Sequence, residues 1–524
     1  MNLKTSHYYI LLIILGGLLF IPSLGSVHLF DWDEINFAEC AREMLVSKDY
    51  WQVQIDYKAF WEKPPLFIWM QVLSMKLFGV NEFAARLPNA IVGIASMCVL
   101  FFIGRRLRDK KFALIFTLLY TISLLPHFYF KSGIIDPTFN LFIYLSIYFF
   151  NASIHHKRKT YYAILCGLSL GLAVLTKGPV AIMLGGLSLI TFCALNNFWG
   201  KLNFKNLLIL SAICILVIGI WVLPNYLIGG AELFNDFINY QIRLLQTQDA
   251  GHGGPIYYHL LVLLLGCFPA SIFIFQKNKT RVTLSATERD FKLWNVILLS
   301  VTLIVFSLVK TKIVHYSSLC YFPITYLSAL ALYNMHEGKN KWNHSSRISF
   351  LVIGVLLAFA FILAPIVMQH SELWIGYVKD PFAIENLKAD VEWKNIHTIA
   401  GVALLAAVLL TFFMAIKRRY RNAFISLTVF MLLALQSAFR IFPSRIEAIS
   451  QAAVVDFCER NQDKNLYPIG YKSYAHLFYG KKMPDSEDKE AIFLLKKPFF
   501  EKNGLEKDYL ILEEKNGYLL LQQR

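Results

Sequence analysis

Residues 8–30, YYILLIILGGLLFIPSLGSVHLF, form a long apolar run, and residues 31–45, DWDEINFAECAREML, follow it with a dense cluster of carboxylates. An apolar run of about 20 residues is long enough to cross a bilayer as a helix. A cleaved signal peptide is the alternative, because SLGS supplies small residues before the acids, but the run is long and its N-terminal flank is weakly basic. The stretch therefore predicts a membrane helix that delivers an acidic segment to the membrane surface.

The rest of the chain repeats this apolar pattern. Of its 524 residues, 56% are hydrophobic and only 16% are charged, and the mean hydropathy is +0.49. A backbone can cross lipid only as a helix or as a closed barrel. We therefore predict a polytopic α-helical membrane protein with about thirteen transmembrane helices. The predicted spans are residues 8–30, 87–104, 112–129, 133–151, 161–176, 178–196, 206–228, 256–275, 292–309, 315–334, 348–368, 397–416 and 422–438.

The formal net charge of +16 reflects membrane topology rather than nucleic-acid binding. Basic residues gather in alternate loops, which the positive-inside rule places in the cytoplasm. These loops are residues 105–111, 155–159, 201–205, 277–281, 339–347 and 417–421. The loops 31–86, 229–255 and 369–396 mix acids with fewer bases, so we expect them to face outward, with interfacial helices in the first two.

The composition changes near residue 440. Residues 446–461 have the pattern of an amphipathic helix, and LYPIGY, AIFLLKK, DYLILEE and GYLLLQQ have the pattern of short strands between charged turns. We predict a transmembrane domain over residues 1–440 and a small α/β domain over residues 441–524, the latter outside the cytoplasm.

Two acidic positions stand out in the outward segments. Asp33 and Glu34 open the acidic segment, where a solvated loop is the simplest interpretation. Asp136, in KSGIIDPTFNLF, lies at a membrane edge, where ionisable groups are costly and often functional. Asp136 with Pro137 could instead cap a helix, and Lys131 is a candidate ion-pair partner.

Several outward cations suggest an anionic ligand, because outward lysines at helix ends are unusual. They are Lys177 in LTKGP and Lys310 and Lys312 in KTKIVHY, with Tyr316 beside them and Arg243 in the second outward loop. Lys177 could also only extend its amine to the membrane interface. Glu62, next to Lys63 in FWEKPPLFIW, and His252 could share a divalent metal, although a loop histidine beside glycines is usually no ligand.

Taken together, the ordered motifs resemble the GT-C class of membrane glycosyltransferases, specifically the lipid A aminoarabinose transferase family, and more distantly the protein O-mannosyltransferases. The matching segments cover about the first 325 residues. They are Asp33-Glu34 followed by AREML, EKPP, FG-NEFAARLP, the Asp136 segment, LTKGP and KTKIVHY. The sequence departs from the lipid A branch at Asn36 and Phe37, where that branch favours Arg and Tyr, and at Thr311, where the family has Ser. These departures leave the acceptor open.

The resemblance implies transfer of a sugar from a polyprenyl-phosphate donor to lipid A or a related envelope glycolipid. It places the enzyme in the bacterial cytoplasmic (inner) membrane with its site outside, as a monomer. It implies roles for Asp33, Asp136 and Lys63 in catalysis, for Glu34, Lys177, Arg243, Lys310, Lys312 and Tyr316 in binding, and for Glu62 and His252 at a possible divalent metal.

Displacing the carrier phosphate from the sugar needs charge stabilisation on that phosphate and would invert the anomeric centre. Asp33 would act as a base towards a hydroxyl acceptor, or only orient an acceptor that is already an anion. Transfer to protein is one alternative. A transporter or flippase of anionic lipids is another, although no second half resembles the first and the charges lie at one face.

Overall fold

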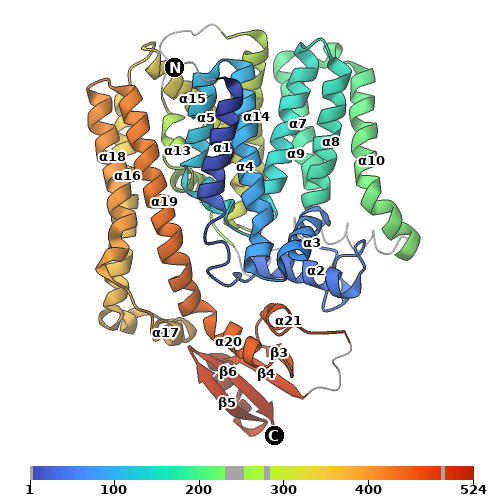
Figure 1. Ribbon diagram of the computed structural model, residues 1–524, viewed down its shortest axis with the longest axis vertical. Helices are drawn as coiled ribbons and strands as arrows, with labels where there is room; N and C mark the ends of the chain where they lie inside the picture. Colours follow the sequence, from blue (N-terminus) through green and yellow to red (C-terminus); the bar gives the residue numbers. More distant parts are fainter. Residues whose placement is uncertain (1–3, 230–252, 277–283, 485–489) are drawn as a thin grey trace.

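The apolar segments fold into a bundle of helices that lie side by side in this computed structural model (Figure 1), which describes residues 4–229, 253–276, 284–484 and 490–524. The bundle contains α1 (Thr5–Phe20), α4 (Glu82–Leu107), α5 (Lys110–Thr121), α7 (Asp136–His155), α8 (Lys159–Lys177), α9 (Val180–Asn196), α10 (Phe204–Gly229), α12 (Tyr258–Gly266), α13 (Ala270–Phe273), α14 (Ala286–Leu308), α15 (Tyr321–His336), α16 (His344–Gln369), α18 (Ile399–Ile416) and α19 (Tyr420–Ser450). The chain is a multi-pass membrane protein.

Polar caps mark where several of these helices begin. Asn81, Asp109 and Asn343 each accept a hydrogen bond from a backbone N–H of the first turn, at 2.9, 2.8 and 2.7 Å, in α4, α5 and α16. Such caps satisfy amides that have no partner inside the helix and stabilise it by about 1 kcal/mol. In the sequence, an Asn or Asp before an apolar run therefore indicates where each of these helices begins.

The predicted count of about thirteen spans remains a prediction. Seven helices among the described residues are long and apolar enough to cross a membrane, and α1, α9 and α3 (Leu66–Phe78) are shorter apolar helices. Residues 112–129 break into α5 and α6 (Leu124–Tyr129), and Pro126, which has no N–H, lies in the second piece. Residues 256–275 similarly break into α12 and α13 at Pro269. The predicted break between the spans 161–176 and 178–196 is present as a short turn, in which Gly178 separates α8 from α9 with a φ of 82°.

Shorter elements gather beyond one end of the bundle. They are α2 (Asp33–Ser47), β1 (Gln54–Ile55), β2 (Lys58–Ala59), α3, η2 (Val314–Cys320), η3 (Ser371–Leu373), η4 (Ile375–Tyr377), α17 (Pro381–Leu387) and η5 (Asn395–Thr398); η1 (Trp199–Lys201) precedes α10. The helix expected in residues 31–86 is thus present as α2 and α3, whereas the one expected in residues 229–255 lies almost entirely outside the described residues. Most of α2 is buried rather than lying on an open interface.

The C-terminal residues form a four-stranded sheet with the order β3-β4-β6-β5. Its elements are β3 (Asn465–Ile469), β4 (Ala491–Lys496), β5 (Tyr509–Lys515) and β6 (Tyr518–Gln523), with α20 (Ala452–Arg460), α21 (Ala475–Phe478), α22 (Lys497–Asn503) and η6 (Leu505–Lys507). β3 and β4 are parallel and the other pairs are antiparallel. Each of the four segments expected to be a strand forms one, whereas α19 runs without interruption through the predicted boundary at residue 440.

The sheet and α2 share one apolar core. Ile35 and Ala41 of α2 are buried in the same cluster as Val455 of α20 and Leu477 of α21. Figure 1 shows α2 and α3 between the bundle and the C-terminal sheet. The first outward segment and the C-terminal residues are therefore packed as one layer, although the sequence separates them by about 400 residues.

Candidate active site

Asp33 is the first residue of α2 and meets a histidine from far along the chain. Its Oδ2 lies 3.5 Å from Nε2 of His315, and both side chains are partly exposed. Both residues also line a cavity of about 380 Å³ with the loop before α2, the turn between α6 and α7, and α19. Asp33 is thus available to a bound molecule while an imidazole lies beside it.

Asp136 is buried at the start of α7 and pairs with Lys177 at the end of α8. Lys177 Nζ donates to Asp136 Oδ1 at 2.5 Å, and the side chains of Lys177 and Asp136 are 12% and 2% exposed. Asp136 makes no capping hydrogen bond to the first turn of α7. Asp136 and Pro137 do lie at the start of α7, as the capping interpretation expected, but the carboxylate of Asp136 also pairs with Lys177. The interpretation of Lys177 as a cation that only reaches for the interface is wrong.

The helix η2 joins the two carboxylates. Its His315 lies beside Asp33, the ring of Tyr316 lies 5.5 Å from Lys177 Nζ, and Ser318 Oγ donates to Asp136 Oδ1 at 3.5 Å. His315 and Ser318 thus contact the two acidic positions, and Tyr316 contacts the lysine that pairs with Asp136. The structure places Asp33, Asp136, Lys177 and Tyr316 around η2, and their roles in the reaction stay predictions.

Glu34 lines the same cavity as Asp33 but is buried, and its carboxylate is engaged with protein groups. Its carboxylate accepts two hydrogen bonds from Arg86 at 2.9 and 2.7 Å, and one each from the amides of Phe30 and Gly133. Burial by itself would raise the pKa of this carboxyl, but Arg86 and the two amides outweigh burial and hold the pKa below its usual value. Glu34 therefore ties the start of α2 to α4 and to the turn before α7, which positions Asp33.

The remaining predicted lysines have different surroundings. Lys312 Nζ donates to the carbonyls of Phe306, Ser307 and Val309, so its three N–H groups complete the end of α14. Lys310 is exposed. Lys63 is partly exposed, precedes α3, and lies near enough to Asp136 to act on its charge. Lys63 therefore belongs with the Asp136 group, whereas Lys312 is engaged in the fold.

Arg243 and His252 lie outside the described residues, so their predicted roles, and the proposed metal between Glu62 and His252, stay predictions. Glu62 is described and partly exposed. No group of three or more His, Cys, Asp or Glu side chains within the described ranges has the arrangement of a metal site.

Lys131 has other partners than the sequence analysis expected. Lys131 does not pair with Asp136; its Nζ donates to the carbonyls of Leu19 and Pro22 at 3.0 and 2.9 Å and lies 4.2 Å from the Phe439 ring. Burial and Arg440 lower the pKa of Lys131 to about 8. His315 was visible only as part of KTKIVHY, and nothing in a single histidine beside lysines identifies Asp33 as its neighbour.

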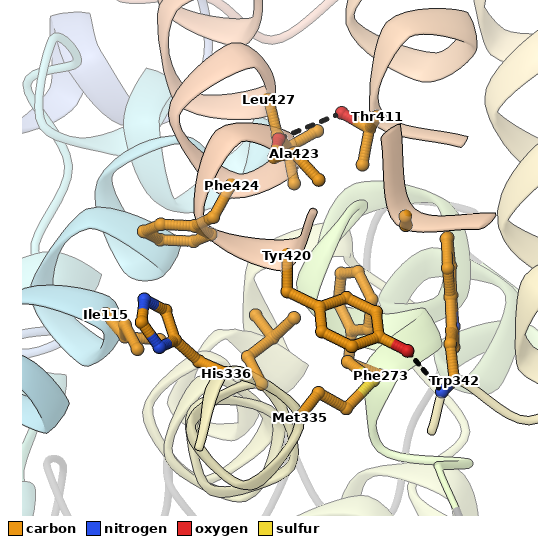
Figure 2. Close-up of a pocket in the computed structure, with 12 residues that line it drawn as sticks. Ile115, Phe273, Met335, His336, Trp342, Thr411, Tyr420, Ala423, Phe424 and Leu427 are labelled. Atoms are coloured by element: carbon orange, nitrogen blue, oxygen red, sulfur yellow. Dashed lines mark hydrogen bonds between the residues drawn. The ribbon is translucent and has the colours of Figure 1, made fainter. Parts of the chain in front are cut away.

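A second cavity, drawn in Figure 2, lies between the starts of α5 and α19 and the end of α15. It measures about 30 Å³, enough for roughly one water molecule, and its lining is mostly apolar. The backbone N–H of Trp342 donates a hydrogen bond of 3.3 Å to the hydroxyl of Tyr420 across this cavity. The acidic groups described above lie at the opposite ends of these helices, so this cavity is separate from the candidate active site.

Comparison with known proteins shows which solved structures share this fold. The fold matches the crystal structure of ArnT from Cupriavidus metallidurans bound to undecaprenyl phosphate, with a TM-score of 0.78, 18% identity, and coverage of 99% of this chain and 98% of that one. The same protein in its apo state gives a TM-score of 0.74 with 17% identity, covering 98% of each chain. The chain therefore has the fold of this structure, and the predicted resemblance to the GT-C class of membrane glycosyltransferases is confirmed.

The chain is also similar in sequence to several named proteins and to one family model. The chain is 26% identical over 386 residues to the undecaprenyl phosphate-alpha-4-amino-4-deoxy-L-arabinose arabinosyl transferase of Erwinia tasmaniensis, covering 71% of this chain and 68% of that protein. It is 25% identical to the enzyme of the same name from Pectobacterium carotovorum, covering 76% and 74%. Residues 62–224 match the family model described as dolichyl-phosphate-mannose-protein mannosyltransferase.

Proposed function

We propose that this enzyme transfers a sugar from a polyprenyl-phosphate donor to lipid A or a related envelope glycolipid, by inverting displacement at the outer face of the bacterial inner membrane. The observation that carries the proposal is the junction at η2, where His315 lies beside Asp33 and Tyr316 and Ser318 lie beside the Asp136–Lys177 pair. The relatives named as arabinosyl transferases support undecaprenyl phosphate as the carrier and an aminoarabinose as the sugar.

The cations belong to the donor side of this site. Lys177 is held beside Asp136, and Lys63 acts on the same carboxylate. When the bond between the anomeric carbon and the phosphate oxygen breaks, its electron pair stays on the phosphate. Positive charge fixed in advance stabilises that developing anion. Arg243, which lies outside the described residues, stays a further candidate for this role.

Asp33 and His315 belong to the acceptor side, because both line the 380 Å³ cavity. The acceptor oxygen forms the new bond to the anomeric carbon. If that oxygen is a hydroxyl, its proton passes to Asp33 or His315; if it is a phosphate oxygen, no proton is removed and the two residues orient the acceptor. The geometry is compatible with both courses.

The orientation is proposed from charge. Asp33, Asp136 and the C-terminal sheet lie towards one end of the bundle, and basic loops such as 155–159 and 417–421 lie at the other. The positive-inside rule then places the site outside the cytoplasm. We also propose that the enzyme acts as a monomer, and that a divalent metal, if one is used, is held by Glu62 and His252.

Asp33→Asn and Asp136→Asn test the proposal. Each variant is expressed in a strain that lacks the native chain, and lipid A is analysed by mass spectrometry. We expect the sugar substituent to be present with the native chain and absent with either variant, at equal protein levels in the membrane. Full modification by both variants would overturn the site. Adding EDTA to isolated membranes tests the metal separately.

Transfer to protein is the second candidate, since residues 62–224 match the mannosyltransferase model. The same strains distinguish the two acceptors. A glycan missing from envelope proteins, with lipid A unchanged, would replace the lipid acceptor by a protein acceptor and leave the site intact. Loss of neither modification would contradict both proposals.

A further inference from the structure

A cavity of about 250 Å³ opens at the end of the bundle opposite the active site. Its polar lining comes from Ser153 at the end of α7, Lys159 at the start of α8, and Asn203 and Asn206 around the start of α10; Phe150 and Phe198 are among its apolar walls. By the charge argument above this end is cytoplasmic. The cavity therefore opens where lipid headgroups of the inner leaflet lie.

The polar groups of this cavity are donors. Asn203 Oδ1 accepts from the Asn206 amide at 3.2 Å, and Asn206 Oδ1 accepts from Thr160 at 3.3 Å. Both side-chain NH₂ groups, and the Lys159 amine, are without a hydrogen-bond partner within the part of the chain that the structure describes. No acidic side chain lines the cavity. These groups match a phosphate, which accepts several hydrogen bonds.

The surroundings add charge and an apolar surface. Lys157, Arg158 and Lys205 flank the cavity and, like Lys159, are exposed and form no ion pair with a described residue. Phe204 is 75% exposed and Trp199 is 54% exposed beside it, and such aromatics favour the headgroup level of a bilayer. Further along α10, Leu208 and Ile215 are exposed and offer a surface for acyl chains.

We propose that this cavity binds the headgroup of one anionic phospholipid of the cytoplasmic leaflet, with its phosphate at Lys159, Asn203 and Asn206 and its acyl chains along α10. Basic pockets between membrane helices on the cytoplasmic side are suited to anionic lipids. A lipid in this cavity would contact the end of α7 and the start of α8. The opposite ends of these two helices carry Asp136 and Lys177.

Native mass spectrometry of the full chain in detergent tests this site, with dioleoyl-phosphatidylglycerol as the anionic probe and dioleoyl-phosphatidylcholine as the neutral one. We expect one phosphatidylglycerol to bind more tightly than phosphatidylcholine. Lys159→Gln/Lys205→Gln should weaken it roughly 30-fold, from about fivefold for each lysine at a membrane surface. Asn203→Asp keeps a side chain that caps α10 but places a negative charge at the phosphate, so it should abolish the preference.

The matched control is Lys417→Gln/Arg421→Gln, which removes two exposed charges from another loop at the same end. It should bind phosphatidylglycerol as the native chain does. Equal weakening by both double variants would reduce the effect to net charge and overturn the site. Absence of any preference for phosphatidylglycerol would also overturn it, as would its displacement by an equal concentration of soluble glycerol phosphate, because free phosphate would then be the ligand.

Discussion

The Asp136–Lys177 ion pair lets stability and catalysis be separated. Lys177→Met removes the cation and leaves Asp136, which is 2% exposed, without its charged partner. At 2.5 Å and an effective dielectric constant of about 20, the attraction between the two charges is roughly 6–7 kcal/mol. Because much of this offsets the cost of burying the pair, breaking it from one side should destabilise the fold by about 3–5 kcal/mol.

The double variant Asp136→Asn/Lys177→Met removes both charges. A buried pair replaced as a whole is often nearly neutral for stability, so this variant should be more stable than Lys177→Met alone. Sugar transfer should be absent from both, because each lacks Lys177, the cation proposed to stabilise the departing phosphate. Exposed Lys58→Met, which lies on β2, is the control and should change neither property.

Stability can be followed through the cysteines. All eight are free, seven of them buried, so a thiol-reactive fluorescent dye reports unfolding as the temperature rises. Transfer is measured in the same membranes by mass spectrometry of lipid A. If the loss of stability in the double variant equals the sum of the losses in Asp136→Asn and Lys177→Met, the two charges are not coupled and the reasoning fails. Transfer by a folded double variant would remove the pair from the site.

Three more predictions follow from the contacts. His315→Gln should lower kcat by about 10²-fold or more if the imidazole takes a proton, with KM little changed; an unchanged kcat would leave His315 only a positioning role. Lys312→Met should lower the unfolding temperature, because three carbonyls at the end of α14 lose their donor, yet retain transfer per folded molecule; loss of transfer would return Lys312 to phosphate binding. Burial and Glu39 raise the pKa of Glu43 to about 8 from a usual 4.5, so stability should fall by up to about 1.4 kcal/mol per pH unit between these values; thermal unfolding of Glu43→Gln should lack this slope.

The sequence predicted the class of fold because membrane helices and strands have local signals. Apolar length marked the bundle helices, and short apolar, β-prone segments between charged turns marked β3 to β6. The span count was less accessible, since Pro126 and Pro269 interrupt runs that are continuous in hydropathy. Hydropathy averages over such a run and does not register one missing backbone donor.

The site was predictable where the resemblance supplied motifs and unpredictable where partners had to be chosen. Lys131 is the lysine nearer to Asp136 in sequence and was its candidate partner. Its amine instead donates to the carbonyls of Leu19 and Pro22. The partner is Lys177 because the start of α7 and the end of α8 adjoin when the two helices pack antiparallel. Pairing of this kind depends on tertiary packing, which no spacing rule within one segment expresses.

The same dependence explains why the C-terminal residues matter to Asp33. The hydroxyl of Tyr479 accepts from the Leu29 amide at 2.7 Å, and Gln451 donates to the Leu29 carbonyl and accepts from the Asp31 amide. The Glu34–Arg86 pair fixes the other side of the same turn. Asp33 is therefore held from two directions, by α4 and by residues beyond α19. A carboxylate so constrained reaches its working position without further ordering on binding, which lowers the entropic cost of the reaction geometry. In the proposed mechanism, Gln451 and Tyr479 thus contribute through the position of Asp33, without lying at the reacting atoms themselves.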